Sequence, residues 1–405
     1  MERQEKMVVA LAGCSHAFSH GYMLIFPAVL LLLQKEFSLG YLELGIIGNI
    51  MFFTYGLGAL PGGMIYNLLG PKRLYLICFI GSTVSLILAA ASSSLLVLTA
   101  GLALLGVFGS LYHPLANAMI TGKVREYGRA LGIHGAAGNL GLAMAPFAAG
   151  VIASHLGWRH AYLWFALPGI LLSVWSIFVD MSPGEEMKAF GESTSEKKSS
   201  GSHLKIYFSL PLVLVYLANM MHSFCFNGSL TFLPAYMAKR TSFHLFSLDS
   251  VALGGMLSSI VLLMGVVGQF GGGILSQKPD LERKFLIVSA ISLPFIVAMS
   301  FTTDILLLGL ALIFFFFNFF LQPMNNTLLA QYTAANMRGP AFGIYFFVAF
   351  VFGSLASSFS GYVAQVFGLQ WVFTGLSGSI LLLVFFAFVL QKIKRHEAGG
   401  MNPDP

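Results

Sequence analysis

The sequence contains little charge. Only 9% of its 405 residues are charged, 57% are apolar, and the mean hydropathy is +0.81. Soluble globular proteins carry about 25% charged residues, so this composition excludes a water-soluble enzyme and a nucleic-acid-binding protein. The net charge of +6 therefore needs an explanation other than a basic surface for nucleic acid.

Cysteine is also scarce. The three cysteines, Cys14, Cys78 and Cys225, all lie in apolar runs. An odd number of thiols inside hydrocarbon excludes a disulfide framework and a thiolate metal site. No cofactor is expected, and no metal site is predicted.

Long apolar runs are what the sequence has instead. They fall near 8–34, 43–67, 74–92, 95–120, 129–153, 159–180, 207–236, 250–276, 284–302, 304–328, 340–366 and 370–391. A bilayer is crossed by about 20 apolar residues, and a lipid-embedded backbone must satisfy its own hydrogen bonds, so each run is predicted to be a helix. The predicted fold class is all-α, a polytopic membrane protein with twelve transmembrane helices.

The basic residues indicate the orientation. If the N-terminus lies in the cytoplasm, only Lys35, Arg159, Lys239 and Arg240 of the 22 Lys and Arg residues face the outside. Cytoplasmic loops are enriched in Lys and Arg. The sequence thus predicts a multi-pass protein of the cytoplasmic membrane with both termini in the cytoplasm.

A polar stretch divides the runs six and six. Residues 181–205 hold acids, lysines, serines and glycines that cannot bury apolar area, which is typical of a flexible linker. We predict an N-terminal six-helix bundle at 1–180, a cytoplasmic linker at 181–205, a C-terminal six-helix bundle at 206–395 and a disordered tail at 396–405.

The two halves resemble each other. A shift of 211 overlays Gly128–Tyr162 on Gly339–Phe373, pairing Gly132 with Gly343 and Gly157 with Gly368, and a shift of 210 pairs Gly58 with Gly268 and Arg73 with Arg283. Two parallel repeats around an axis along the membrane normal are known in secondary transporters. The predicted architecture is two pseudo-symmetric bundles.

Two motifs carry a family resemblance. The segment 63–73, Gly-Met-Ile-Tyr-Asn-Leu-Leu-Gly-Pro-Lys-Arg, resembles the loop motif of the major facilitator superfamily, with Asn67 and Leu68 where that family has an acid and a base. Gly138-Asn139-Leu-Gly141 with Pro146 resembles a Gly/Pro motif associated with antiporters. Gating and packing roles are expected for Gly63, Asn67, Gly70, Lys72, Arg73, Asn139, Gly141, Pro146, Gly353 and Gly361.

A narrower resemblance covers the N-terminal half. Ser15-His16, Phe37-Ser38-Leu39, Tyr112-His113-Pro114 and Gly138-Asn139 are similar to the fosmidomycin-resistance branch of drug exporters. That branch has an Asp where His20 stands and usually a Glu where Leu115 stands, so its protonatable carboxylates do not carry over.

In the superfamily fold, the first, fourth, seventh and tenth helices line a central cavity. The polar residues of the matching runs are therefore the predicted substrate cavity: His16, His20, His113, Asn117, Asn219, His222, Asn318, Gln322 and Asn325. No acid, Lys or Arg lies near the centre of a run, which leaves histidine as the group able to titrate near neutrality. His20, His113 and His16 are the candidate proton carriers.

The predicted function is secondary active transport by alternating access. A cavity without a carboxylate favours a small neutral or anionic amphipathic substrate, and we expect proton-coupled efflux by a monomeric antiporter, with a role in drug resistance. Uptake or exchange of a small organic anion is the alternative. Metal transport is less favoured because no acids or thiols accompany the histidines, and a membrane enzyme would need a nucleophile, base and orienting group that the sequence does not bring together.

Overall fold

The computed structural model describes residues 1–182, 209–243, 245–333 and 337–399, with the side chains of 59–64, 67, 339, 340 and 396–399 left aside. Its helices in the first half are α1 (Arg3–Phe37), α2 (Tyr41–Ala90), α3 (Leu95–Ser110), α4 (Tyr112–Lys123), α5 (Tyr127–Leu156) and α6 (Trp158–Ile177). Those in the second half are α8 (Leu210–Arg240), α9 (Ser250–Ser276), α10 (Leu281–Met299), α11 (Asp304–Gln331), α12 (Arg338–Val366), the short 3₁₀ helix η3 (Leu369–Trp371) and α13 (Val372–Gly399).

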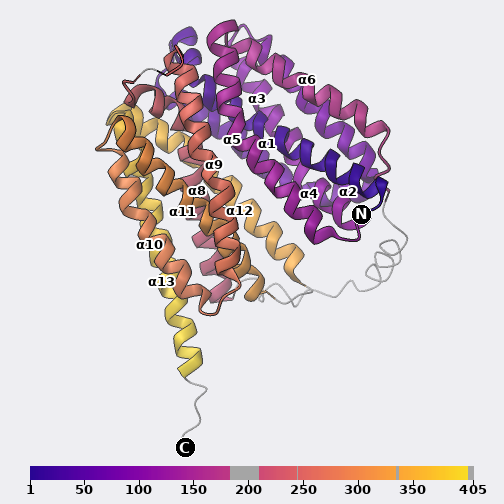
Figure 1. The fold of residues 1–405 in the computed structure, drawn as a ribbon, viewed down its shortest axis with the longest axis vertical. Coiled ribbons are helices and arrows are strands. Elements are labelled where there is room, and N and C mark those ends of the chain that lie inside the picture. Colours follow the sequence, from indigo (N-terminus) through magenta and orange to yellow (C-terminus); the bar gives the residue numbers. More distant parts are fainter. Residues whose placement is uncertain (183–208, 244, 334–336, 400–405) are drawn as a thin grey trace, which may run out of the picture.

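These elements form twelve helical rods in two bundles, α1–α6 and α8–α13 (Figure 1). The long α2 contains two rods, because the backbone turns at Gly70, where φ is 73°. In contrast, α3 and α4 together make the single rod predicted at 95–120, interrupted at Leu111. Within the part of the chain that the structure describes, ten helical segments are long and apolar enough to span a membrane. The α10 rod is not among them, and its first turn carries Glu282, Arg283 and Lys284.

The predicted repeat has a backbone counterpart. Gly157 after α5 and Gly368 after α12 adopt φ values of 92° and 102°. A positive φ costs glycine little but strains other residues, so the same left-handed turn ends the equivalent helix in each bundle.

The predicted linker falls mainly on 183–208, which lies outside the described residues, as do residues 400–405 of the predicted tail.

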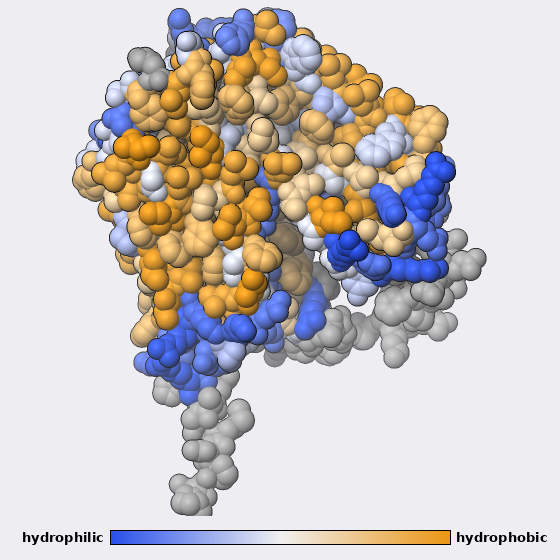
Figure 2. Space-filling model, viewed as in Figure 1, coloured by the Kyte–Doolittle hydropathy of each residue, from blue (hydrophilic) through white to orange (hydrophobic). Residues whose placement is uncertain are grey.

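The outer surface of the bundles is apolar. Large exposed side chains such as Leu171, Phe270, Leu306 and Phe385 form a hydrophobic band, with hydrophilic residues gathered at both ends (Figure 2). Exposed apolar area of this extent marks a surface that faces lipid. The buried cores therefore lie inside each bundle and at the contact between the bundles.

Small residues bring the bundles together on the side opposite the termini. Gly45 of α2 and Gly361 of α12 meet backbone to backbone, and a Cβ atom on Gly361 would collide with the Tyr41 carbonyl. Between α5 and α9, Pro146 and Gly255 make a similar close contact. On the side of the termini the halves separate, and Figure 2 shows a hollow between them.

Two more glycines of the expected gating and packing set lie within single bundles. Gly141 packs against Ala17 of α1, and Gly353 lies against Asn227 and the Ser223 backbone of α8. A side chain at any of these positions would force neighbouring helices apart, so these glycines permit close packing there. A hinge function for them stays a prediction.

Candidate functional site

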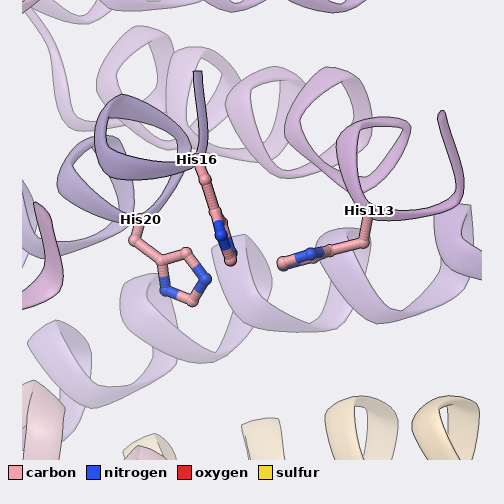
Figure 3. A group of neighbouring side chains, drawn as sticks. All are labelled: His16, His20 and His113. Atoms are coloured by element: carbon pink, nitrogen blue, oxygen red, sulfur yellow. The ribbon is translucent and has the colours of Figure 1, made fainter. Parts of the chain in front are cut away.

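A cluster of three histidines lies on the inner side of the N-terminal bundle. His16 and His20 are four residues apart on α1 and so share a face, and His113 stands at the start of α4. The ring centroids of His16 lie 4.6 Å from His20 and 5.0 Å from His113, and those of His20 and His113 are 5.4 Å apart. Figure 3 shows the three rings converging from the two helices.

His134 of α5 orients this cluster. Its ring stacks on that of His16 with centroids 3.9 Å apart, and its backbone carbonyl accepts a hydrogen bond from His16 Nδ1 at 2.7 Å. A carbonyl oxygen can only accept, so the hydrogen of neutral His16 lies on Nδ1 and the lone pair lies on Nε2. His16 Nε2 is buried and has no partner among the described residues.

Tyr112 completes the support. Its hydroxyl donates to the Ala12 carbonyl at 2.5 Å and lies 3.0 Å from His134 Nε2. Because its single hydrogen goes to Ala12, the hydroxyl oxygen accepts from His134 Nε2–H. The rings of His16 and His134 are thus held by a hydrogen-bond network linking α1, α4 and α5. The rings of His20 and His113 contact His16 without a hydrogen bond of their own among the described residues.

A cavity of about 110 Å³ lies between the cluster and the C-terminal bundle. Its lining comprises His20, Asn219, His222, Ser223, Phe226, Asn227, Asn318, Phe319, Gln322, Asn326, Tyr345, Phe346, Ala349 and Phe350. The side formed by α8 and α11 carries the polar groups together with Phe226 and Phe319, and the side formed by α12 is mostly aromatic.

The polar side of the cavity is only partly satisfied. His222 Nε2 donates to the Asn318 carbonyl at 2.9 Å, and Asn219 Nδ2 donates to the Tyr345 carbonyl at 3.1 Å. The side-chain nitrogen and oxygen of Asn318 are buried and lack partners among the described residues. A buried amide without a partner is costly, so this side chain is available to a ligand.

No carboxylate, Lys or Arg is found among the residues that line the cavity. Two acids of the described chain are nevertheless buried, Glu5 and Glu282, and both lie in the first turn of a helix near the side of the termini. Glu282 is paired with Lys394 at 2.5 Å. The only titratable side chains at the cavity wall are therefore imidazoles and the phenol of Tyr345.

Five of the nine predicted cavity residues line this space: His20, Asn219, His222, Asn318 and Gln322. His16 and His113 lie behind His20 in the cluster. Asn325 forms a second layer and donates to Asn219 Oδ1 at 3.3 Å. Asn117 is exposed one helical turn beyond His113 and is outside the cavity lining.

Sequence reasoning missed the wall formed by α12. Tyr345, Phe346, Ala349 and Phe350 recur on one face of that helix, and this spacing was the available signal, although a lipid-facing helix has the same pattern. It also missed Gln269 of α9. Asn139 Nδ2 donates to Gln269 Oε1 at 2.6 Å, and Gln269 Nε2 donates to Gln322 Oε1 at 2.5 Å, which links the cavity wall to the contact between the bundles.

The predicted loop motif lies on the side of the termini. Lys72 Nζ donates to the Ile177 carbonyl at the end of α6 at 2.7 Å, which fixes the turn at Gly70 against that helix. Arg73 shares with them a surface pocket of about 490 Å³. The surroundings of Gly63 and Asn67 are not described, so the expected roles of these two residues stay predictions.

Two pseudo-symmetric helical bundles with an apolar outer surface and a small polar cavity between them are the architecture of a membrane transporter. The chain belongs to the Major Facilitator Superfamily, whose family model matches residues 11–357. The resemblance seen in the loop motif is thereby confirmed at the level of the superfamily.

Several named transporters are similar to this chain. A probable sulfoacetate transporter of Cupriavidus necator is 26% identical over 368 residues, which cover 82% of each chain. A probable galactarate/D-glucarate transporter of Escherichia coli K12 is 24% identical and covers 90% of this chain and 89% of its own length. A D-galactonate transporter of Escherichia coli O6:H1 is 21% identical, with 90% of each chain covered.

Solved structures share the fold. A bacterial homologue of the human lysosomal transporter Spinster, in an inward-facing and occupied conformation, superposes with a TM-score of 0.78 at 15% identity, over 97% of this chain and 96% of that one. The nucleoside transporter NupG gives a TM-score of 0.75 at 13% identity, over 96% of this chain and all of that one. These likenesses support the architecture alone.

Proposed function

We propose that the protein carries a small organic anion across the cytoplasmic membrane by alternating access, in the direction of uptake. The relatives transport sulfoacetate, galactarate, D-glucarate and D-galactonate by their names, and all of these compounds are carboxylates or sulfonates. They favour the organic-anion alternative over the drug efflux, antiport and drug resistance expected from the N-terminal motifs, for which these relatives give no support.

The observation that carries the proposal is a cavity that offers neutral hydrogen-bond donors and no acid. Asn318 and His222 lie together on its polar side, and His20 faces them from the N-terminal bundle. A carboxylate in such a site would repel an anion, whereas amide and imidazole N–H groups bind one. The volume of about 110 Å³ fits a small compound.

The charge of the anion must be compensated inside the membrane, where isolated charge is costly. The cavity lining contains no Lys or Arg, so we assign this role to protons carried by His20 together with His113 and His16. A proton that enters with the anion neutralises the loaded site and lets the bundles close around it. Transport is then proton-coupled, and the acidic side of the membrane drives uptake.

The proposed orientation places both termini, Lys72 and Arg73 in the cytoplasm, in accordance with the excess of basic residues on that side. The hollow between the bundles then opens inward (Figure 2). The close contacts at Gly361 and Pro146 close the outer side. This arrangement is that of an inward-facing carrier, and we propose that it works as a monomer.

The test is uptake by the purified full chain in proteoliposomes. Sulfoacetate, galactarate and D-galactonate are compared with a neutral sugar and an organic amine of similar size, with an inward proton gradient and a metal chelator present. We expect at least one anion to accumulate in the proteoliposomes and neither the amine nor the sugar to accumulate. Accumulation of the amine, or no anion uptake by folded protein, would refute the proposal; export of fosmidomycin would restore the drug-exporter alternative.

A further inference from the structure

The three histidines of the cluster bring nitrogen donor atoms close together. One ring nitrogen from each of His16, His20 and His113 lies within 4.8 Å of the other two (Figure 3). Zinc binds imidazole at about 2.0–2.1 Å in a tetrahedral arrangement, which separates neighbouring nitrogens by about 3.3 Å. Small side-chain rotations of the half-buried His20 and His113 would close the remaining gap.

The spacing of these residues favours a shared ligand. His16 and His20 are four residues apart on α1, a spacing that in helical metal motifs directs two imidazoles at one ion. His113 approaches from α4, beside the interruption at Leu111, so the third donor comes from a second helix. An ion held by all three would join α1 to α4.

The hydrogen bonds behind the cluster prepare one donor in the required tautomer. His16 Nδ1–H is committed to the His134 carbonyl at 2.7 Å, which leaves the lone pair of Nε2 free. Metal-bound histidines commonly donate their other N–H to a carbonyl in this way. His16 is only 8% exposed, and its Nε2 has no partner among the described residues, so an ion would satisfy an otherwise orphaned buried nitrogen.

The ligand set selects the class of ion. Three imidazoles without carboxylate or thiolate suit Zn²⁺, Ni²⁺, Cu²⁺ or Co²⁺ and are poor ligands for Mg²⁺ or Ca²⁺. We propose that His16, His20 and His113 form a binding site for one divalent transition-metal ion of the zinc class. Its fourth position is left for water or a small ligand, because His20 also lines the cavity.

The site goes beyond the proposed transport function. Ion and protons would use the same nitrogen lone pairs, so a bound ion excludes proton loading of the cluster. By bridging α1 and α4 it would also hold the N-terminal wall of the cavity in one arrangement. We therefore expect micromolar Zn²⁺ to inhibit transport and a chelator to restore it.

Binding is tested without any transport substrate, so its outcome does not depend on the proposed function. The purified full chain is stripped with a chelator and titrated with Zn²⁺ by calorimetry. We expect one ion per chain with a micromolar or lower Kd, and at least a tenfold loss of affinity in His16→Asn and in His113→Asn. The control is His155→Asn, an exposed histidine at the end of α5, which should bind as the unmodified chain does.

Cobalt gives a readout that needs no variant. Co²⁺ bound by three imidazoles in a four-coordinate site shows intense visible absorption bands, unlike the weak bands of the hydrated ion. Melting temperatures identify any variant that fails to fold. If a variant fails to fold, the cobalt spectrum of the unmodified chain tests the metal site in its place. The proposal is overturned by the absence of stoichiometric Zn²⁺ binding, by unchanged binding when all three histidines are replaced, or by the spectrum of hydrated cobalt.

Discussion

The two walls of the cavity differ in chemistry. The N-terminal bundle contributes imidazoles, with His20 at the surface and His16 and His113 behind it, held by His134. The C-terminal bundle contributes amides and aromatic rings, among them Asn318. The C-terminal wall also holds the imidazole of His222, but its Nε2–H is committed to the Asn318 carbonyl. The cluster of imidazoles that the proposal assigns to protons lies on the N-terminal wall.

This difference separates two tasks that a coupled carrier must perform. The amide wall can recognise the anion by neutral hydrogen bonds, and the histidine wall can respond to protons. Substitutions on the two walls are therefore expected to have different signatures: a loss of affinity at every pH on one side, and a changed pH profile on the other.

The largest effect is expected from Asn318→Leu. The change keeps the number of side-chain heavy atoms and removes the unpaired buried amide that faces the cavity. A hydrogen bond to a charged group contributes about 1.5–3 kcal/mol, which corresponds to a loss of about 10- to 150-fold in apparent affinity for the anion. Initial rates of labelled anion uptake in proteoliposomes measure it.

The matched control is Leu306→Ala on the same helix, where the side chain is 60% exposed on the outer surface. It should leave the KM unchanged. An unaltered KM in Asn318→Leu would show that the Asn318 amide does not bind the anion.

A smaller effect, but a more specific one, is expected from His20→Asn. Asparagine retains an N–H donor and cannot take a proton near neutrality, so uptake should fall about three- to tenfold at pH 6 and little at pH 8. The other histidines near this group, on α1, α4 and α5, are His16, His113 and His134. Their presence explains why the loss is partial.

The variant His222→Asn tests whether an imidazole on the opposite wall also affects the pH profile. His222 is tied to the Asn318 carbonyl, so its replacement should raise the KM and leave the shape of the pH profile unchanged. The division between the walls fails if both variants change the pH profile equally.

The smallest effect is expected outside the membrane, at the ion pair between Asp180 and Lys123. The hydrogen bond from Lys123, helped by the Ser182 backbone N–H, lowers the pKa of Asp180 to about 2. A carboxylate with a lowered pKa stabilises the fold above its unfolded value near 3.9, and this contribution disappears as the pH falls toward 2.

Asp180→Asn should therefore lower the free energy of unfolding at pH 7 by less than about 1 kcal/mol, because Asp180 is half exposed and exposed pairs are weak. Thermal melts of the purified protein at pH 7 and near pH 2 measure the difference. A difference that persists near pH 2 would assign the effect to packing rather than to charge.

Much of the fold could be predicted from the sequence because the bilayer imposes strong rules. Apolar runs must be helices, and the repeat located the equivalent turns at Gly157 and Gly368. His16 and His20 could be placed on one face from their spacing alone. The interruption at Leu111 also has a signal, because Pro114 follows three residues later and a proline lacks the N–H that a continuous helix needs.

The site was harder to predict from the sequence, because its residues come from distant segments of the chain. His134 and His16 are separated by 118 residues, and their stacking depends on how α1 packs against α5. The aromatic face of α12 has the same pattern as a face in lipid, so only the packed bundle distinguishes Phe350 in the cavity from Phe352 on the surface. Both the stacking of His16 on His134 and the position of Phe350 in the cavity therefore depend on tertiary packing.

The most direct measurement is the movement of protons with the anion. Proteoliposomes containing the protein are placed in weakly buffered medium with a chelator, and the external pH is followed after addition of the transported anion. We predict alkalinisation with the unmodified protein and its loss when His16, His20 and His113 are replaced together by Asn. Anion uptake without any proton movement, and undiminished by that triple replacement, would contradict the account.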